Sequence, residues 1–143
     1  MHCRGSPAGR PVVIGLDTNV HVRHLAQDDP KQSVVATRFI EALTSRSPGF
    51  VSHIVLAETL WVLESCYQAD ATMIDRVVEM LLRTDSIRVD APETVWRALR
   101  QFRNDRGDFS DILINAIARD AGCDAVCTFD QNAAKRLGMM LLK

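Results

Sequence analysis

Short apolar runs alternate with longer stretches of helical periodicity along most of the chain. The first run, residues 12–16, is brief and ends at an aspartate, as is typical of a strand buried on both faces. Four further strands are predicted at residues 50–51, 87–89, 125–129 and 140–142. Strands that alternate with helices favour a parallel sheet covered on both sides. We therefore expect an α/β fold with three layers, α/β/α, around a short and mainly parallel central sheet.

The predicted helices are separated by proline, glycine and polar turn residues. The clearest pattern falls at intervals of i, i+3, i+4, i+7 and i+8, the stripe of a helix that faces a core. Its members are Ile74, Val77, Val78, Leu81 and Leu82. Further helices are predicted after Pro30 as far as residue 43, and at residues 54–67, 92–104, 112–121 and 132–137. Thr18 and Asn19 are interpreted as a polar turn after the first strand, and the nearby His21 and His24 as surface residues.

Composition sets limits on the class of protein. The 143 residues, 47% of them hydrophobic, are enough for one core, so we expect a single domain over residues 12–143. Residues 1–11 are rich in Gly, Pro and Arg and predict a disordered leader or a misplaced start. The 17 basic and 18 acidic side chains nearly cancel, so a polyanion would need a local patch. The four cysteines lack zinc-site spacing, and no apolar run is long enough for a membrane, so a cytoplasmic protein is expected.

Four acidic residues are the candidates for chemistry. Asp17 and Asp130 each follow a predicted strand, at the edge where open parallel sheets bind ligands, although either could be an ordinary helix cap. Glu58 shares a helix face with Ile54 and Trp61, so its carboxylate should lie among apolar groups. An arginine partner or a surface position is the alternative for Glu58, since unpaired buried Glu is rare.

The fourth candidate, Asp111, opens a predicted helix together with Asp108. Acids in a first turn are favoured by capping and by the helix dipole, which is a sufficient explanation for either one alone. Asp111, Asn115 and Ala118 nevertheless share one face, and a polar pair beside a small residue can border a cavity. If Asp17, Glu58, Asp111 and Asp130 converge, their repulsion calls for cations. Oxygen ligands alone match Mg²⁺ or Mn²⁺, which support phosphodiester hydrolysis.

Four segments resemble the acidic motifs of PIN-domain VapC toxins. They are Ile14–Asn19, Val55–Glu58, Asp108–Ile114 and Thr128–Asp130. The resemblance covers the chain from Val12 onward and implies a PIN-like fold. It implies that Asp17, Glu58, Asp111 and Asp130 bind the metal and act in catalysis. It also implies that Asp108 is an accessory acid and that Asn19 and Thr128 orient the carboxylates. Asn115 is added as an accessory residue because it shares the face of Asp111.

The resemblance further implies a metal-dependent endoribonuclease that acts as the toxin of a type II toxin–antitoxin pair. Its substrate would be transfer or ribosomal RNA, and its partners a second copy of the chain and a cognate VapB-type antitoxin. Arg103 and Arg106 precede Asp108 and are candidate contacts to RNA phosphates, although arginines at helical spacing are more often a solvated face. Trp61 and Trp96 are interpreted as core or interface residues.

Two other functions remain open. A PIN-fold protein can process or bind RNA outside a toxin–antitoxin system. An aspartate-based phosphohydrolase would use Asp17 as phosphate acceptor, with a lysine near the phosphate. The lysines of the chain, Lys31, Lys135 and Lys143, do not follow strands in the required place. Glu58 would also have no role in that scheme, so the sequence favours the nuclease.

Overall fold

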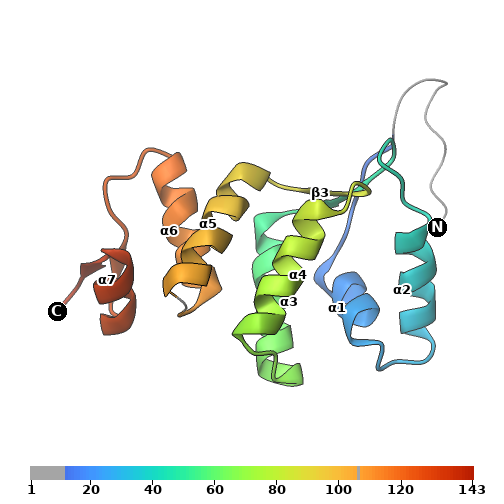
Figure 1. Cartoon of the computed structure of the whole chain (residues 1–143), viewed down its shortest axis with the longest axis horizontal. Helices are drawn as coiled ribbons and strands as arrows, with labels where there is room; N and C mark the ends of the chain where they lie inside the picture. Colours follow the sequence, from blue (N-terminus) through green and yellow to red (C-terminus); the bar gives the residue numbers. More distant parts are fainter. Residues whose placement is uncertain (1–11, 106) are drawn as a thin grey trace. The chain divides into compact units, whose positions relative to one another are not determined.

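The computed structural model describes residues 12–105 and 107–143. The predicted leader, residues 1–11, therefore lies outside the described residues. The chain divides into two compact units, and the boundary falls between Asp90 and Ala91. Both units combine helices with parallel strands (Figure 1). No helix in the described part of the chain is both long and apolar enough to cross a membrane.

The first unit is built on three parallel strands in the order β1-β2-β3. The strands are β1 (Ile14–Gly15), β2 (Gly49–Val51) and β3 (Ile87–Val89). Two helices follow each of the first two strands: α1 (Thr18–Ala26), α2 (Gln32–Glu41), α3 (His53–Tyr67) and α4 (Ala71–Arg83). Parallel neighbours require such crossovers, because the chain must return to the same end of the sheet before it can pair again.

Capping and periodicity explain where these helices begin and which face they bury. The side chain of Asp70 accepts a hydrogen bond from the amide of Met73 at 2.9 Å and so starts α4. The predicted stripe of α4 is buried at Ile74, Val77, Val78 and Leu81. Burying a side chain of this size contributes about 1.5–3 kcal/mol relative to leaving it exposed, so the stripe holds α4 on the core.

Two hydrogen bonds between side chains tie α1 and its following loop to α3. The hydroxyl of Thr18 donates to Glu58 Oε1 at 2.8 Å, and the hydroxyl of Tyr67 donates to Asp28. Because residues 18 and 28 meet residues 58 and 67 in the same order, α1 and α3 run in the same direction. This packing leaves His21, on α1, only 2% exposed. The sequence prediction of a surface His21 was therefore wrong, since α1 is covered by packing against both α2 and α3.

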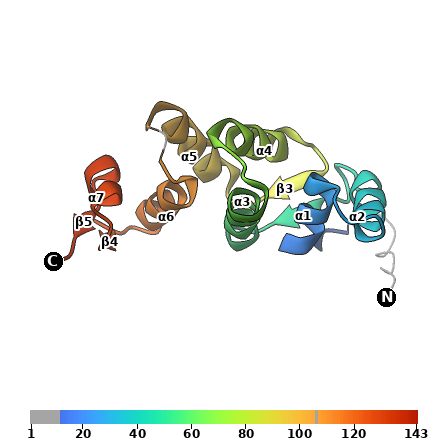
Figure 2. The same ribbon diagram turned by 90° about the horizontal axis from the view of Figure 1, so that it is seen from below.

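The second unit pairs two long helices and ends in a small parallel sheet. Its elements are α5 (Pro92–Asp105), α6 (Phe109–Asp120), β4 (Cys127–Thr128), α7 (Gln131–Leu137) and β5 (Met140–Leu141). Phe102 and Phe109 pack edge to face with ring centroids 5.6 Å apart, which joins α5 to α6. Strands β4 and β5 pair in parallel, and α7 connects them and lies against both (Figure 2).

The predicted α/β fold with short parallel strands is confirmed, with differences in detail. The strands form two sheets, one in each unit. The first strand is an edge strand of two residues whose Gly15 is exposed, rather than a run buried on both faces. Only Cys127–Thr128 of the predicted strand 125–129 is extended, and Phe129 is 79% exposed. The predicted turn at Thr18–Asn19 is the first turn of α1, because Asp17 caps a helix there.

Candidate active site

Three of the predicted acids are helix N-caps. Asp17 Oδ1 accepts from the amide of Thr18 at 2.8 Å, and Asp130 Oδ1 accepts from the amides of Asn132 and Ala133. Asp108 Oδ1 accepts from Ser110 and Asp111 in the same way. The capping alternative is therefore correct for all three. Capping does not exclude a second role, because only Oδ1 is engaged, and among the described residues no donor is recorded for the Oδ2 atoms of these three caps.

In the first unit, Thr18 connects two of the predicted acids. Its amide donates to Asp17 and its hydroxyl donates to Glu58, so both carboxylates lie around one threonine. Helix α1 supplies Asp17 at its start, directly after β1, and α3 supplies Glu58 from its second turn. The two acids are far apart in sequence, and their shared contacts with Thr18 bring them close together.

The surroundings of Glu58 differ from the prediction. Glu58 is exposed, and its helix neighbours Ile54 and Trp61 are themselves 73% and 64% exposed. The buried face of α3 carries Leu56, Thr59, Leu60 and Leu63 instead. Because α3 is apolar on nearly all sides, its sequence did not reveal which face is covered. Of the two interpretations of Glu58, the surface position is therefore correct and the apolar surroundings are wrong. Trp61 does not lie in the core, which leaves the interface interpretation as a prediction.

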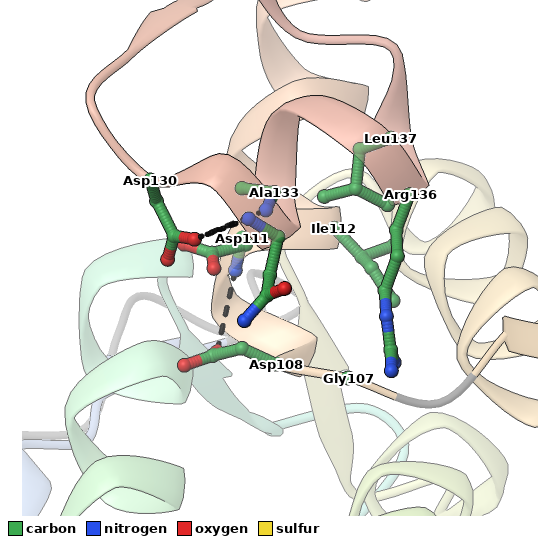
Figure 3. A pocket seen from close by; sticks show the side chains of 9 residues that line it. Gly107, Asp108, Asp111, Ile112, Asp130, Ala133, Arg136 and Leu137 are labelled. Carbon is green, nitrogen blue, oxygen red and sulfur yellow. Dashed lines mark hydrogen bonds between the residues drawn. The ribbon is translucent and has the colours of Figure 1, made fainter. Parts of the chain in front are cut away.

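In the second unit, Asp108, Asp111 and Asp130 line one pocket of about 280 Å³ (Figure 3). The remaining lining residues are Gly107, Ile112, Asn132, Ala133, Arg136 and Leu137. The N-cap and first turn of α6 supply Asp108 and Asp111, the N-cap of α7 supplies Asp130, and α7 forms much of the rest. Gly107 has a φ of +82°, a conformation that favours glycine, so this turn can bring Asp108 to the pocket.

Electrostatic crowding is the main property of this pocket. Burial raises the pKa of Asp111 above its ordinary value, and the negative charges of Asp108 and Asp130 raise it further. Within residues 12–105 and 107–143, no lysine or arginine forms an ion pair with these three carboxylates. The pocket therefore concentrates three carboxylates that form no ion pair among the described residues, although Arg136 also lines it.

The other predicted site residues lie in varied positions. The hydroxyl of Thr128 accepts a hydrogen bond from the amide of Asp130 at 3.0 Å and so holds the turn that carries this acid. Asn115 is buried and donates to the carbonyl of Leu137 at 3.3 Å, which fastens α6 to the end of α7. Its amide does not line the pocket of Asp111.

Asn19 and the arginines lie elsewhere. Asn19 borders a larger, mostly apolar cavity of about 540 Å³ formed by β1, α1 and α2. Arg103 is exposed in the last turn of α5, and Arg106 lies outside the described residues. The neighbouring Arg97 is held by Asp120, to which it donates at 2.7 Å, so this arginine joins α5 to α6.

Sequence analysis missed two contributors to these acidic groups. Thr18 bridges Asp17 and Glu58, and the only signal available was its place directly after an aspartate at a strand end. Arg136 lines the pocket of Asp111 although it lies on a short helix whose sequence gives no hint of a site. Both contributions depend on contacts between separate elements, which a local pattern does not display.

The donor set fits a hard divalent cation. Carboxylate oxygens without histidine or cysteine are the ligands of Mg²⁺ and Mn²⁺, and among the described residues no donor engages the Oδ2 atoms of Asp17, Asp108 and Asp130. A divalent ion would also offset the repulsion that raises the pKa of Asp111. In the part of the chain that the structure describes, no group of three His, Cys, Asp or Glu side chains has the closeness of a formed metal site. The three acids thus line the same pocket, but their side chains are not close enough together to form a complete metal-binding site among the described residues.

Comparison with known proteins identifies the family. The PIN-domain family model matches residues 14–138, a range that covers most of both units and contains both acidic groups. The chain belongs to the PIN-domain family. It is 27% identical over 123 residues to a VapC ribonuclease of Aquifex aeolicus (strain VF5), an alignment that covers 86% of this chain and 90% of the relative. The resemblance to VapC-type PIN-domain proteins that the acidic segments carry is thereby confirmed.

Proposed function

We propose that this protein is a metal-dependent endoribonuclease and the toxin of a type II toxin–antitoxin pair. The observation that carries the proposal is the pocket lined by Asp108, Asp111 and Asp130, which form no ion pair with a lysine or arginine among the described residues. The similarity to a VapC ribonuclease supports RNA as the substrate. Residues 12–143 would then act together as one PIN domain in the cytoplasm.

The proposed ligands are the carboxylates of Asp17, Glu58, Asp111 and Asp130, with Mg²⁺ or Mn²⁺ as the cofactor. A divalent ion held by such oxygens supplies charge compensation at the phosphate and activation of a water molecule. The chain's own part is to present the oxygens in fixed positions. Helix amides hold Oδ1 of Asp17 and Asp130, and the Thr18 hydroxyl holds Glu58. The amide–Oδ1 bonds leave Oδ2 for the cofactor.

Several residues have supporting roles in this proposal. Asp108 adds a further negative charge beside Asp111, and the Thr128 hydroxyl orients the turn of Asp130. Asn115 acts indirectly by fastening α6 to α7. Asn19 would contribute from the first turn of α1, and Arg103 and Arg106 would contact RNA phosphates. Each role is tested by substituting the residue and comparing the loss of cleavage with that caused by substituting one of the four proposed ligands.

A cleavage assay tests the activity. Purified protein is incubated with transfer RNA and with ribosomal RNA, separately, in Mg²⁺, in Mn²⁺ and in EDTA, beside an Asp111→Asn variant. We expect internal cuts that need a divalent ion and that disappear in the variant. Cleavage that persists in EDTA would remove the metal from the proposal, and intact RNA under all conditions would remove the nuclease.

The proposed partners require separate measurements. Light scattering of the purified chain should give about twice the 15.9 kDa monomer mass if it is a homodimer. Co-expression with a candidate VapB-type antitoxin should give a stable complex that no longer cuts RNA if the chain is the toxin of such a pair. A nuclease that stays active in such a complex would instead be an RNA-processing PIN protein.

A further inference from the structure

A cationic side chain borders the acidic pocket without being paired to its acids. Arg136 lines the pocket together with Asp108, Asp111 and Asp130. Figure 3 shows the three carboxylates gathered toward one side and Arg136 on the other, with its guanidinium near Gly107. A Cβ atom added at Gly107 would come within 3.3 Å of Arg136 Nη1, which confirms how closely this side chain passes the turn.

The position of Arg136 follows from how α7 packs. Ala133 and Leu137 are the buried residues of this helix, so its neighbouring face carries Arg136 to the pocket rim. Nη1 donates to the carbonyl of Asp105, at the end of α5, at 3.3 Å. The guanidinium is therefore held at one place, and among the described residues this carbonyl is the one hydrogen-bond acceptor recorded for it.

A guanidinium in this position can bind an oxyanion through its remaining N–H donors. It carries five N–H donors in a planar fork that matches phosphate, and the bond to Asp105 uses one of them. Carboxylates alone would repel the phosphates of an RNA strand, whereas a cation at the rim offsets that repulsion. No ion pair joins Arg136 to a carboxylate within the described part of the chain, so its charge is not cancelled by a single partner.

We propose that Arg136 binds an RNA phosphate beside the bond that is cut and thereby positions the strand at the carboxylates. The inference rests on the proposed ribonuclease function. It differs from the contacts expected of Arg103 and Arg106, which were suggested by charge spacing alone. Arg136 is a binding residue in this scheme, so its loss weakens the hold on RNA more than it slows the chemical step.

The test compares two matched substitutions on α7. Arg136→Gln removes the charge and keeps a polar amide at this exposed position. Lys135→Gln removes the same charge from the adjacent residue, which is exposed and does not line the pocket. Arg136→Lys keeps the positive charge and loses the paired N–H donors of the planar guanidinium. Thermal unfolding of each variant shows that the fold is intact before activity is compared.

Cleavage of a labelled RNA and RNA binding in an Asp17→Asn background are then measured at several salt concentrations. Arg136→Gln should raise KM about tenfold with kcat changed less than about threefold, as for loss of one charge-assisted contact. The slope of log affinity against log salt should fall by about 0.7, the value for one phosphate contact on a single strand. Lys135→Gln should change neither quantity, and Arg136→Lys should recover part of the loss.

Three outcomes would overturn the inference. Equal effects of Arg136→Gln and Lys135→Gln would show a general charge effect. An unchanged KM and salt slope would show that Arg136 does not meet RNA. Tighter Mn²⁺ binding by Arg136→Gln with unchanged RNA binding would make Arg136 a counter-ion of the acids. The RNA-binding measurement does not depend on cleavage, so it tests the role of Arg136 even if the wild-type protein cuts no RNA. Absence of cleavage by the wild-type protein would instead reject the proposed function.

Discussion

The two acidic groups of this protein share aspartates that cap helix amides, and they differ in the charge that surrounds them. Around Thr18 in the first unit, a main-chain amide and a hydroxyl donate to Asp17 and Glu58, so each carboxylate is held by a neutral donor. Around the pocket of the second unit, Asp111 lies beside Asp108 and Asp130, and their charges raise its pKa. The first group is ordered by hydrogen bonds before any cation arrives, whereas the second carries repulsion that a cation would relieve.

This difference predicts the largest effect at Asp111. Asp111→Asn should lower RNA cleavage by about a thousandfold or more, since a metal contributes several kcal/mol to such a transition state and each 1.36 kcal/mol is tenfold in rate. In EDTA the same variant should be at least as stable as wild type, because a crowded charge has been removed. Single-turnover cleavage and denaturant unfolding measure the two effects.

The control for Asp111 is Asp124→Asn, which removes an exposed acid of the same unit outside the pocket. It should change neither cleavage nor stability. The double variant Asp17→Asn with Asp111→Asn then tests whether the two groups serve one reaction, since residues that act as a unit are strongly non-additive. Fully multiplied losses in the double variant would show that the two groups act independently.

The two regions should also respond to acid in opposite directions. Burial lowers the pKa of His21 from 6.5 to about 4, with a smaller contribution from the charge of His24, and its Nε2 has no hydrogen-bond partner among residues 12–105 and 107–143. In the unfolded chain His21 is therefore protonated below about pH 6.5, whereas in the folded chain it is protonated only below about pH 4. Stability is lost as pH falls through this window, by up to about 3 kcal/mol.

Asp111 has the reverse sign. Its folded pKa is raised, so the folded chain binds a proton more readily than the unfolded chain, and stability is regained as pH falls through the folded pKa. Denaturant unfolding at pH 7, 5.5 and 4.5 should show that His21→Leu reduces the acid loss and that Asp111→Asn increases it. An identical pH dependence of wild type and His21→Leu would contradict the assignment of His21.

A smaller effect is expected at the bridge of the first group. Thr18→Val removes the hydroxyl that donates to Glu58 and leaves the amide bond to Asp17 in place. Loss of such an orienting partner weakens metal binding about tenfold. Mn²⁺ titration of Thr18→Val, with Thr18→Ser to restore the hydroxyl and the exposed Thr72→Val as control, measures it. Unchanged Mn²⁺ affinity in Thr18→Val would mean that the bridge serves the fold alone.

The sequence predicted those features of the fold and the site that depend on adjacent residues, and it did not predict those that depend on packing between separate elements. The stripe of α4 and strand β3 were predicted with correct positions because both follow from periodicity over adjacent residues. The caps at Asp17 and Asp130 were recognised as alternatives for the same reason. The burial of His21 and the place of Arg136 were not predicted, and the exposure of Glu58 was only one of two alternatives, because each depends on packing between separate elements. On α3, apolar residues surround the helix and conceal the covered face.

The smallest predicted effect separates capping from charge within the second group. Asp108→Asn keeps an N-cap of equal strength for Ser110 and Asp111, so stability should change by less than about 0.5 kcal/mol, whereas Asp108→Ala should cost about 1 kcal/mol. Both variants remove a charge that raises the pKa of Asp111, so an NMR titration of this carboxyl should move toward its ordinary value in both. If Asp108 only caps α6, Asp108→Asn retains full cleavage. If it is an accessory acid, cleavage falls although the helix is intact, and the crowding that distinguishes this group from the one around Thr18 is then part of its function.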